Sequence, residues 1–296
     1  MSIATLSRAA EAWEKTTWNG EPAWAATAAG VRAVVTEVRA RLIYLGAADG
    51  SLNLLNAPTP AAAPTAANHS PNWGGHRFWL GPQYRWAWPP PADWEHRAAT
   101  TVEAHGGVLV VHQPQTDPAY PALVREYAWE GARLRCTARW TGDGRPYFGL
   151  HVVPVNVPFT ITTRLLKWDE APLGLVSARM VGLPAPLQLP HPAIAIEGDH
   201  ATVRAGLRVA KLGFVPQSLE IERSSGWRLA MHPGPHTGLA FDTPDHGYLS
   251  QVWVGGAEAD FAELEQLTPF LVGDAAGACS STIFLEATPP PSSVAR

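Results

Sequence analysis

Short runs of β-branched and aromatic residues, each followed by a turn-forming residue, recur along the chain. The first three runs are Trp24–Thr27, Val31–Val38 and Leu42–Leu45, with turns at Gly30 and at Asp49-Gly50. Runs of this length between such turns are typical of β-strands. The pattern therefore predicts an antiparallel meander near the start of the chain.

The same pattern continues toward the carboxyl terminus. The further predicted strands are Thr100–Ala104, Val108–His112, Val124–Trp129, Leu134–Trp140, Tyr147–Val155, Phe159–Leu166, Ala193–Glu197, Ala201–Ala205, Leu219–Arg223, Arg228–Pro233, Tyr248–Val254, Phe261–Leu267 and Ser281–Glu286. A short helix is expected at Leu6–Lys15. Because no long amphipathic helix separates consecutive strands, we expect an all-β fold, a large antiparallel β-sandwich.

The chain is long enough for one large domain. Of its 296 residues 46% are hydrophobic, and β-sandwiches of this size are often undivided. We expect an N-terminal extension over residues 1–18, a single sandwich domain over 19–288 and a disordered, proline-rich tail over 289–296. Residues 58–71, rich in Ala, Pro and Thr, are interpreted as a surface loop because strands resume soon afterwards.

Composition and charge argue against nucleic-acid and membrane partners. The formal net charge of −4 gives the chain no attraction to nucleic acid or to an anionic membrane. No apolar run approaches the length of about 20 residues that a spanning helix needs, and no export signal is seen at the start. We expect a soluble, cytoplasmic protein with a small-molecule ligand and no nucleic-acid or membrane partner.

Several chemical classes lack their sequence signatures. There is no phosphate-binding loop, no dinucleotide fingerprint and no serine-hydrolase elbow, so no cofactor is expected. No His-x-His pairing is present among the 11 histidines, so no metal is expected either. Cys136 and Cys279 match no paired metal spacing, and we interpret them as reduced core thiols, with a single disulfide as the alternative. The 13 tryptophans offer flat apolar faces that suit stacking on sugar rings.

The segment Gly74–Gln83 carries the first group of candidate binding residues. Paired glycines let the backbone approach a ligand closely, and the side chains of His76, Arg77 and Gln83 supply donors and acceptors. These three residues and Trp79 are predicted to bind the ligand, with His112 at the rim. The alternative is a loop packed by its own aromatic rings, with Arg77 in a structural ion pair.

This segment also carries a resemblance to a known family. Asn19-Gly20, Arg41–Ile43, Asn53–Leu55 and Gly74–Gln83, in that order, resemble an uncharacterised branch of the galactose mutarotase-like, or aldose 1-epimerase-like, superfamily. The resemblance implies the supersandwich form of the β-sandwich, a sugar ligand and mutarotase-type proton transfer on a sugar hemiacetal.

The resemblance also implies a general acid. Phe148–His151 is similar to the Leu-His step that bears the acid in hexose-phosphate mutarotases, which assigns this role to His151. An imidazole suits the role because its ordinary pKa lies near neutrality. The family's Tyr-Phe after the histidine is Val152-Val153 here. The alternative is a histidine at a strand end whose ring is merely satisfied.

The base and a further binding residue come from later segments. Asp260–Pro269 resembles the strand that carries the base in mutarotases, and a period of two places Glu263 and Glu265 on one face, with Glu265 preferred. The alternative is a solvated strand face. Lys211 either binds the ligand or protects an exposed strand edge. His105-Gly106-Gly107 is interpreted as a hairpin turn.

The function expected from these residues is therefore that of an aldose 1-epimerase-like isomerase. Two alternatives remain, since a fold does not determine an activity. One is a carbohydrate-binding protein without catalysis. The other is an isomerase or lyase that uses the same cleft on another metabolite.

Overall fold

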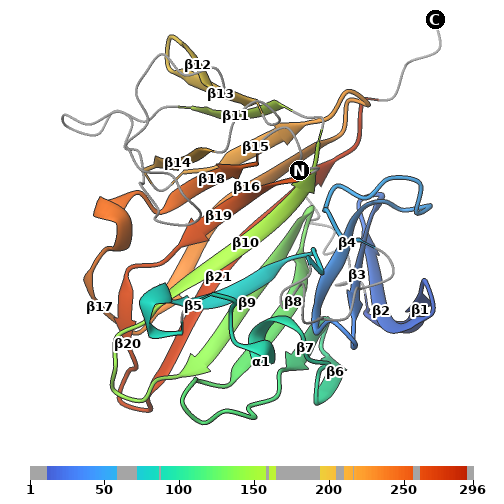
Figure 1. Ribbon diagram of the computed structural model, residues 1–296. Helices are drawn as coiled ribbons and strands as arrows, with labels where there is room; N and C mark the ends of the chain where they lie inside the picture. Colours follow the sequence, from blue (N-terminus) through green and yellow to red (C-terminus); the bar gives the residue numbers. More distant parts are fainter. Residues whose placement is uncertain are drawn as a thin grey trace, which may run out of the picture.

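The computed structural model describes residues 12–58, 72–86, 88–157, 160–164, 194–204, 210–215, 217–255 and 261–291. Almost all regular structure in these residues is antiparallel strand, arranged in four sheets (Figure 1). The expected all-β antiparallel sandwich is confirmed. None of the described helices is long and apolar enough to cross a membrane.

The predicted meander near the start of the chain forms a four-stranded sheet. In order across the sheet its strands are β1 (Glu14–Trp18), β2 (Glu21–Ala28), β3 (Val31–Thr36) and β4 (Arg41–Ala47). The helix expected at Leu6–Lys15 is wrong where it can be compared, because Glu14 and Lys15 belong to β1; residues 1–11 lie outside the described residues. Asn19 and Gly20 both have positive φ, 49° and 84°, and make the two-residue turn that pairs β1 with β2.

A five-stranded sheet forms one layer of the sandwich. In order across the sheet its strands are β14 (Ala210–Phe214), β18 (Ser250–Val254), β19 (Phe261–Leu267), β10 (Phe148–Asn156) and β5 (Arg77–Gly81). The pattern of residues did not predict β5, because all five of its residues are buried and no polar alternation marks the strand.

A ten-stranded sheet forms the opposite layer. In order across the sheet its strands are β12 (Ile194–Glu197), β13 (His200–Arg204), β11 (Thr160–Arg164), β15 (Leu219–Glu222), β16 (Arg228–Thr237), β21 (Ala278–Thr288), β9 (Arg133–Thr141), β8 (Leu123–Glu130), β7 (Val108–His112) and β6 (Thr101–His105). The hairpin predicted at His105-Gly106-Gly107 joins β6 to β7. Residues 289–291 follow β21, and the rest of the predicted tail lies outside the described residues.

The remaining elements are short. They are a two-stranded sheet of β17 (Leu239–Asp242) and β20 (Phe270–Val272), the helix α1 (Ala92–Glu95), and the 3₁₀ turns η1 (Gln83–Arg85) and η2 (Pro244–Gly247).

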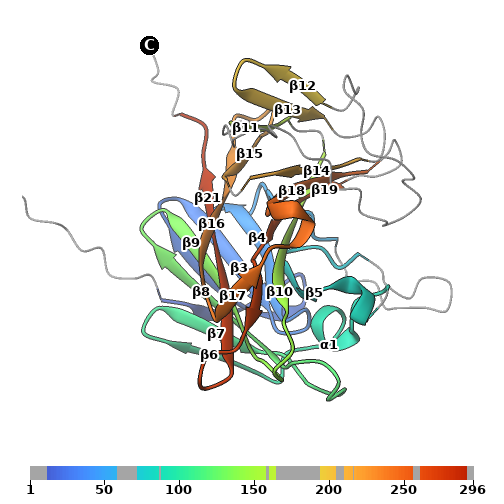
Figure 2. The same cartoon turned by 90° about the vertical axis from the view of Figure 1, so that its left-hand side faces the viewer.

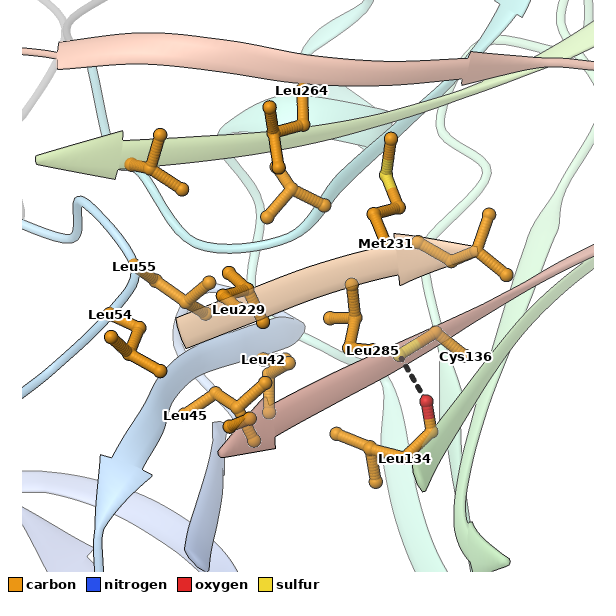
Figure 3. Close-up of a cluster of buried hydrophobic side chains, with 14 of the residues drawn as sticks. Leu42, Leu45, Leu54, Leu55, Leu134, Cys136, Leu229, Met231, Leu264 and Leu285 are labelled. Carbon is orange, nitrogen blue, oxygen red and sulfur yellow. Dashed lines mark hydrogen bonds between the residues drawn. The ribbon is translucent and has the colours of Figure 1, made fainter. Parts of the chain in front are cut away.

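The two large sheets pack face to face around a shared core. Seen from the side, β5 and β10 lie on one side of the sandwich and β21, β9 and β8 on the other (Figure 2). Leu264 of β19 lies in the same buried cluster as Leu229 and Met231 of β16 and Leu285 of β21, all fully buried (Figure 3). Burying one such side chain stabilises the fold by about 1.5–3 kcal/mol, so these contacts fix the register of β19.

The same core holds residues of the four-stranded sheet and the thiol of Cys136. Leu42 and Leu45 of β4 belong to the cluster, together with Leu54 and Leu55 of the following segment (Figure 3). Cys136 is fully buried there, and burial raises the pKa of its thiol. Both cysteines are free and buried, in agreement with the interpretation as reduced core thiols.

Two glycines allow the chain to enter β5. Gly74 and Gly75 have φ of +60° and +68°, a region that L side chains rarely adopt. A Cβ at Gly75 would lie 2.3 Å from the carbonyl oxygen of Leu42, and one at Gly74 would lie 2.1 Å from that of Asn56. The glycine pair is therefore required by close backbone packing.

Replacing Gly75 by alanine should lower the free energy of unfolding by about 3 kcal/mol, from left-handed strain and overpacking combined. Gly50→Ala is the matched control, since Gly50 has φ +82° but nothing within 4 Å of an added Cβ, and should cost about 1–2 kcal/mol. Denaturant unfolding measures both. Equal losses for the two variants would contradict the packing argument.

Candidate functional site

Strand β19 divides its side chains between two faces, as the period of two predicts. Ala262 and Leu264 are fully buried in the core between the large sheets. Glu263 and Glu265 alternate with them and therefore point to the outer face of the five-stranded sheet. Both carboxylates thus share one face of one strand.

Strand pairing brings further polar side chains to the same face. Glu265 lies opposite Gln251 of β18 and Val152 of β10, and Val152 lies opposite Arg77 of β5. In the next row, Glu263 lies opposite Trp253, which in turn lies opposite Lys211 of β14. Directly paired residues project to the same side of a sheet. We call the group made by Arg77, Lys211, Gln251, Glu263 and Glu265 the charged face.

Within the charged face each carboxylate is paired with a cation. Lys211 Nζ lies 2.7 Å from Glu265 Oε2, and the Arg77 guanidinium donates to Glu263 Oε1. The side chains of Lys211 and Glu265 are only 10% and 4% exposed, whereas that of Glu263 is 14% exposed. The face therefore meets solvent over a small area, with its charges largely removed from water.

Burial changes the proton affinity of the central pair. Desolvation raises the pKa of Glu265; the Lys211 ammonium opposes this rise and the Glu263 carboxylate adds to it. Burial alone would lower the pKa of Lys211, but Glu265, with Asp245 and Glu263, outweighs burial and raises it. A carboxylate whose pKa moves up toward neutrality is a stronger base than an exposed one.

Two buried polar atoms on the charged face lack hydrogen-bond partners among the described residues. They are Gln251 Oε1 and Arg77 Nε. The amide nitrogen of Gln251 is occupied, since it donates to Asp245 Oδ2 of η2 at 2.7 Å. Buried polar atoms in proteins are normally paired, so these two unpaired atoms mark the charged face as a candidate binding site.

Aromatic rings flank the cluster. The Arg77 guanidinium lies 5.1 Å from the centre of the Trp79 ring, whose Nε1 donates to Glu95 Oε2 at 2.9 Å. Arg41 pairs with the same carboxylate at 3.1 Å. Trp253, half-buried, is the cross-strand neighbour of both Glu263 and Lys211. Among the predicted binding residues, Trp79 supports Arg77 through this ring contact, and Trp253 is an apolar surface that the sequence analysis missed.

The structure places His151 on the opposite face of β10 from Glu265. It is fully buried between the large sheets, where its Nε2 lies 2.8 Å from Ser281 Oγ of β21 and its Nδ1 lies 2.9 Å from His76 Nε2. The two imidazoles are nearly parallel, with an interplanar angle of 6°. The sequence-predicted acid and base therefore do not meet, because Val152 is the β10 residue that faces Glu265.

Burial also holds the two histidines neutral. Desolvation, followed by the charge of Arg125, lowers the pKa of His151 to about 3. Desolvation, followed by His151 and then by Arg125, lowers the pKa of His76 well below its ordinary value. With so low a pKa the imidazole is not protonated at pH 7, so it does not form the imidazolium that acts as a general acid.

The other predicted binding residues divide between the layers. Arg77 and Lys211 lie on the charged face, and Gln83 lies beyond the end of β5, in η1. His112 ends β7 of the ten-stranded sheet, where Leu109 and Val111 face the core, so its side chain points to the outside of the other layer. Among the described residues, no cluster of three or more His, Cys, Asp or Glu side chains could hold a metal ion.

No protein-family model and no curated protein matches the sequence. Similar solved structures include a galactose mutarotase-like protein from Lactobacillus casei, at 14% identity and a TM-score of 0.59, with 90% of this chain and 100% of that chain covered. A candidate aldose 1-epimerase from Escherichia coli K12 aligns at 12% identity and a TM-score of 0.59, covering 90% and 98%. A candidate mutarotase from Salmonella typhimurium aligns at 11% identity and a TM-score of 0.54, covering 94% of each chain.

The chain has the galactose mutarotase-like fold. The fold class expected from the sequence is thereby confirmed at the level of topology and extent. Identities this low say nothing about individual residues, so any activity has to be argued from the charged face itself.

Sequence reasoning missed part of this candidate site. Gln251 and Trp253 lie in a strand that was predicted, and its period of two would have placed both on one face. Asp245, which accepts from Gln251, follows no strand pattern because it lies in η2. The ion pair of Arg77 with Glu263 joins residues 186 positions apart, and no local signal indicates it.

The buried histidines should make the fold sensitive to acid. Their folded-state pKa values lie below the unfolded value near 6.5, so the unfolded chain binds more protons below that pH, and stability is lost as the pH falls from 6.5 toward the folded pKa of about 3 of His151. Each histidine contributes a slope of about 1.4 kcal/mol per pH unit. The slope is measured from denaturant unfolding between pH 7 and pH 4.

The variant His151→Gln should remove one such contribution to the slope, whatever its effect on stability at pH 7. His105→Gln, at the exposed hairpin of β6 and β7, is the matched control for the loss of a histidine. An unchanged slope in His151→Gln would contradict the assignment.

Proposed function

We propose that the charged face binds a sugar and that the protein catalyses aldose 1-epimerase-type proton transfer, with Glu265 as the base. The observation that carries this proposal is a buried carboxylate on the sheet of a galactose mutarotase-like fold, beside hydrogen-bonding groups that lack partners. Solved proteins of the same fold include a candidate aldose 1-epimerase and a candidate mutarotase, which supports the reaction class.

Mutarotation requires little of a protein. A base takes the proton of the anomeric hydroxyl, an acid protonates the ring oxygen, and the opened aldehyde closes again from either side. Glu265 suits the first step because burial raises the pKa of its carboxyl, which makes the carboxylate a stronger base. Its pairing with Lys211 through Oε2 leaves Oε1 as the atom that accepts the proton.

The neighbouring groups suit a hydroxylated ring. Gln251 Oε1 accepts from a sugar hydroxyl, and Arg77 Nε donates to one, so both atoms gain the partners they lack. The half-buried Trp253 beside Glu263 offers a flat ring for the C–H surface of a pyranose. In this arrangement Glu263 keeps Arg77 in place through their ion pair.

Two observations favour a second candidate, a carbohydrate-binding protein without catalysis. Both glutamates are already paired with cations, and the histidine expected as acid lies on the other side of the sheet. Such a protein would bind sugars with the same side chains and leave the rate of anomer exchange unchanged.

Polarimetry with freshly dissolved aldoses separates the two candidates. The wild-type protein should accelerate the equilibration of at least one sugar beyond the buffer rate. Glu265→Gln should lower kcat by about 10²–10⁴-fold, because the amide cannot accept the proton, while titration calorimetry still detects sugar binding. Glu286→Gln, a carboxylate on β21 of the other layer, is the control and should keep full activity.

Absence of acceleration across the sugar panel, with sugar affinity retained, would replace the enzymatic proposal by the binding one. If the wild-type protein neither accelerates equilibration nor binds any sugar of the panel, the assignment of the charged face to sugars is overturned.

A further inference from the structure

The charged face lacks the imidazole that was expected to supply the acid, and its cations differ in what they can do. A guanidinium does not release its proton in proteins, so Arg77 orients but cannot donate to a leaving oxygen. An ammonium can release a proton, so of the two cations on the charged face Lys211 is the one that can act as an acid. The neighbouring carboxylates act as hydrogen-bond acceptors: Asp245 accepts a hydrogen bond from Gln251, and Glu263 accepts one from Arg77.

The position of Lys211 matches the geometry of the reaction. Its Nζ lies 2.7 Å from Glu265 Oε2, so a donor and an acceptor stand side by side. In a cyclic hemiacetal the hydroxyl to be deprotonated and the ring oxygen to be protonated are bonded to the same carbon. An adjacent acid and base can therefore address both oxygens at once, and Nζ has further N–H groups beyond the one given to Glu265.

We propose that Lys211 is the proton donor of this site and that it works with Glu265 as a directly coupled acid–base pair. The inference rests on the proposed function and assigns its second catalytic group. It gives Lys211 a chemical role in place of the ligand-binding role expected from the sequence.

Glu265 and Lys211 together account for both protons that move in the step. Glu265 takes the proton of the anomeric hydroxyl, the O–H electrons form the carbonyl bond, and the bond from the anomeric carbon to the ring oxygen breaks. The ring oxygen keeps that electron pair and takes a proton from Lys211. The products are the open-chain aldehyde, a neutral carboxylic acid and a neutral amine. Rotation of the carboxyl group then returns the proton to the amine across their contact.

The electrostatics of burial couple the two transfers. The Glu265 carboxylate is the main reason that buried Lys211 stays protonated, since burial alone lowers its pKa. When the carboxylate gains a proton, that support disappears and desolvation favours release of the proton from the ammonium. The acid therefore becomes stronger at the moment when the base acts.

The test compares two substitutions of Lys211. Lys211→Arg keeps a cation beside Glu265 but cannot donate, and Lys211→Ala removes the side chain. With the sugar that responds best to the wild-type protein, both should lower kcat by about 10²-fold or more, while Lys211→Arg keeps its sugar affinity within a few-fold. Lys15→Met, on β1 of the four-stranded sheet, is the control for loss of a lysine.

Chemical rescue distinguishes a donor from a merely structural cation. Methylammonium and other small primary ammonium ions should restore activity to Lys211→Ala, with rates that rise as the added ion becomes more acidic. Circular dichroism of each variant checks that it is folded, and the rescue is measured on folded protein.

The outcomes separate the two levels of proposal. Full activity in Lys211→Arg, in the presence of clear wild-type acceleration, overturns the role of Lys211 and leaves the proposed function standing. The role of Lys211 is likewise overturned if His151→Gln loses activity while Lys211→Arg does not. Absence of any wild-type acceleration overturns both.

Discussion

Three buried arginines hold the segment that leads into β5, and the candidate site depends on them. Arg39 donates to the carbonyl oxygen of Trp73 at 3.0 Å, Arg41 to that of Gly74 at 3.4 Å, and Arg125 to that of His76 at 2.9 Å. All three side chains are at most 1% exposed. Burying a charge is costly unless it is paired, and these carbonyls provide part of the pairing. Burial, more than any neighbour, lowers the pKa of Arg41 to about 10.

The hydrogen bonds of these three arginines explain how a polar face forms on an otherwise apolar sheet. Fixing the backbone up to His76 fixes the direction of Arg77, whose guanidinium then reaches Glu263 across β10 on the same face of the sheet. Gly75 is needed because the chain there passes against the backbone of β4, and Gly74 because it passes against the backbone of Asn56. Stability and site geometry are thus supplied by the same hydrogen bonds.

The sequence predicted the fold better than the site, for identifiable reasons. Strand runs with turn residues between them are local, so β2, β3 and most later strands could be predicted, as could the shared face of Glu263 and Glu265. Strand β5 was missed because it is buried on both faces. The orientation of His151 depends on which sheet covers which side of β10, and that information lies in distant strands such as β21.

The register of β19 ties the chemistry of the protein to its hydrophobic packing. A shift of β19 by one position would turn Leu264 outward and drive both glutamates against the leucines of β16 and β21. An insertion or deletion within this strand would therefore destabilise the whole fold. Substitution of a single side chain on its outer face would be tolerated. Any divergence of ligand preference among proteins built this way should therefore proceed by point substitution rather than by changes in strand length.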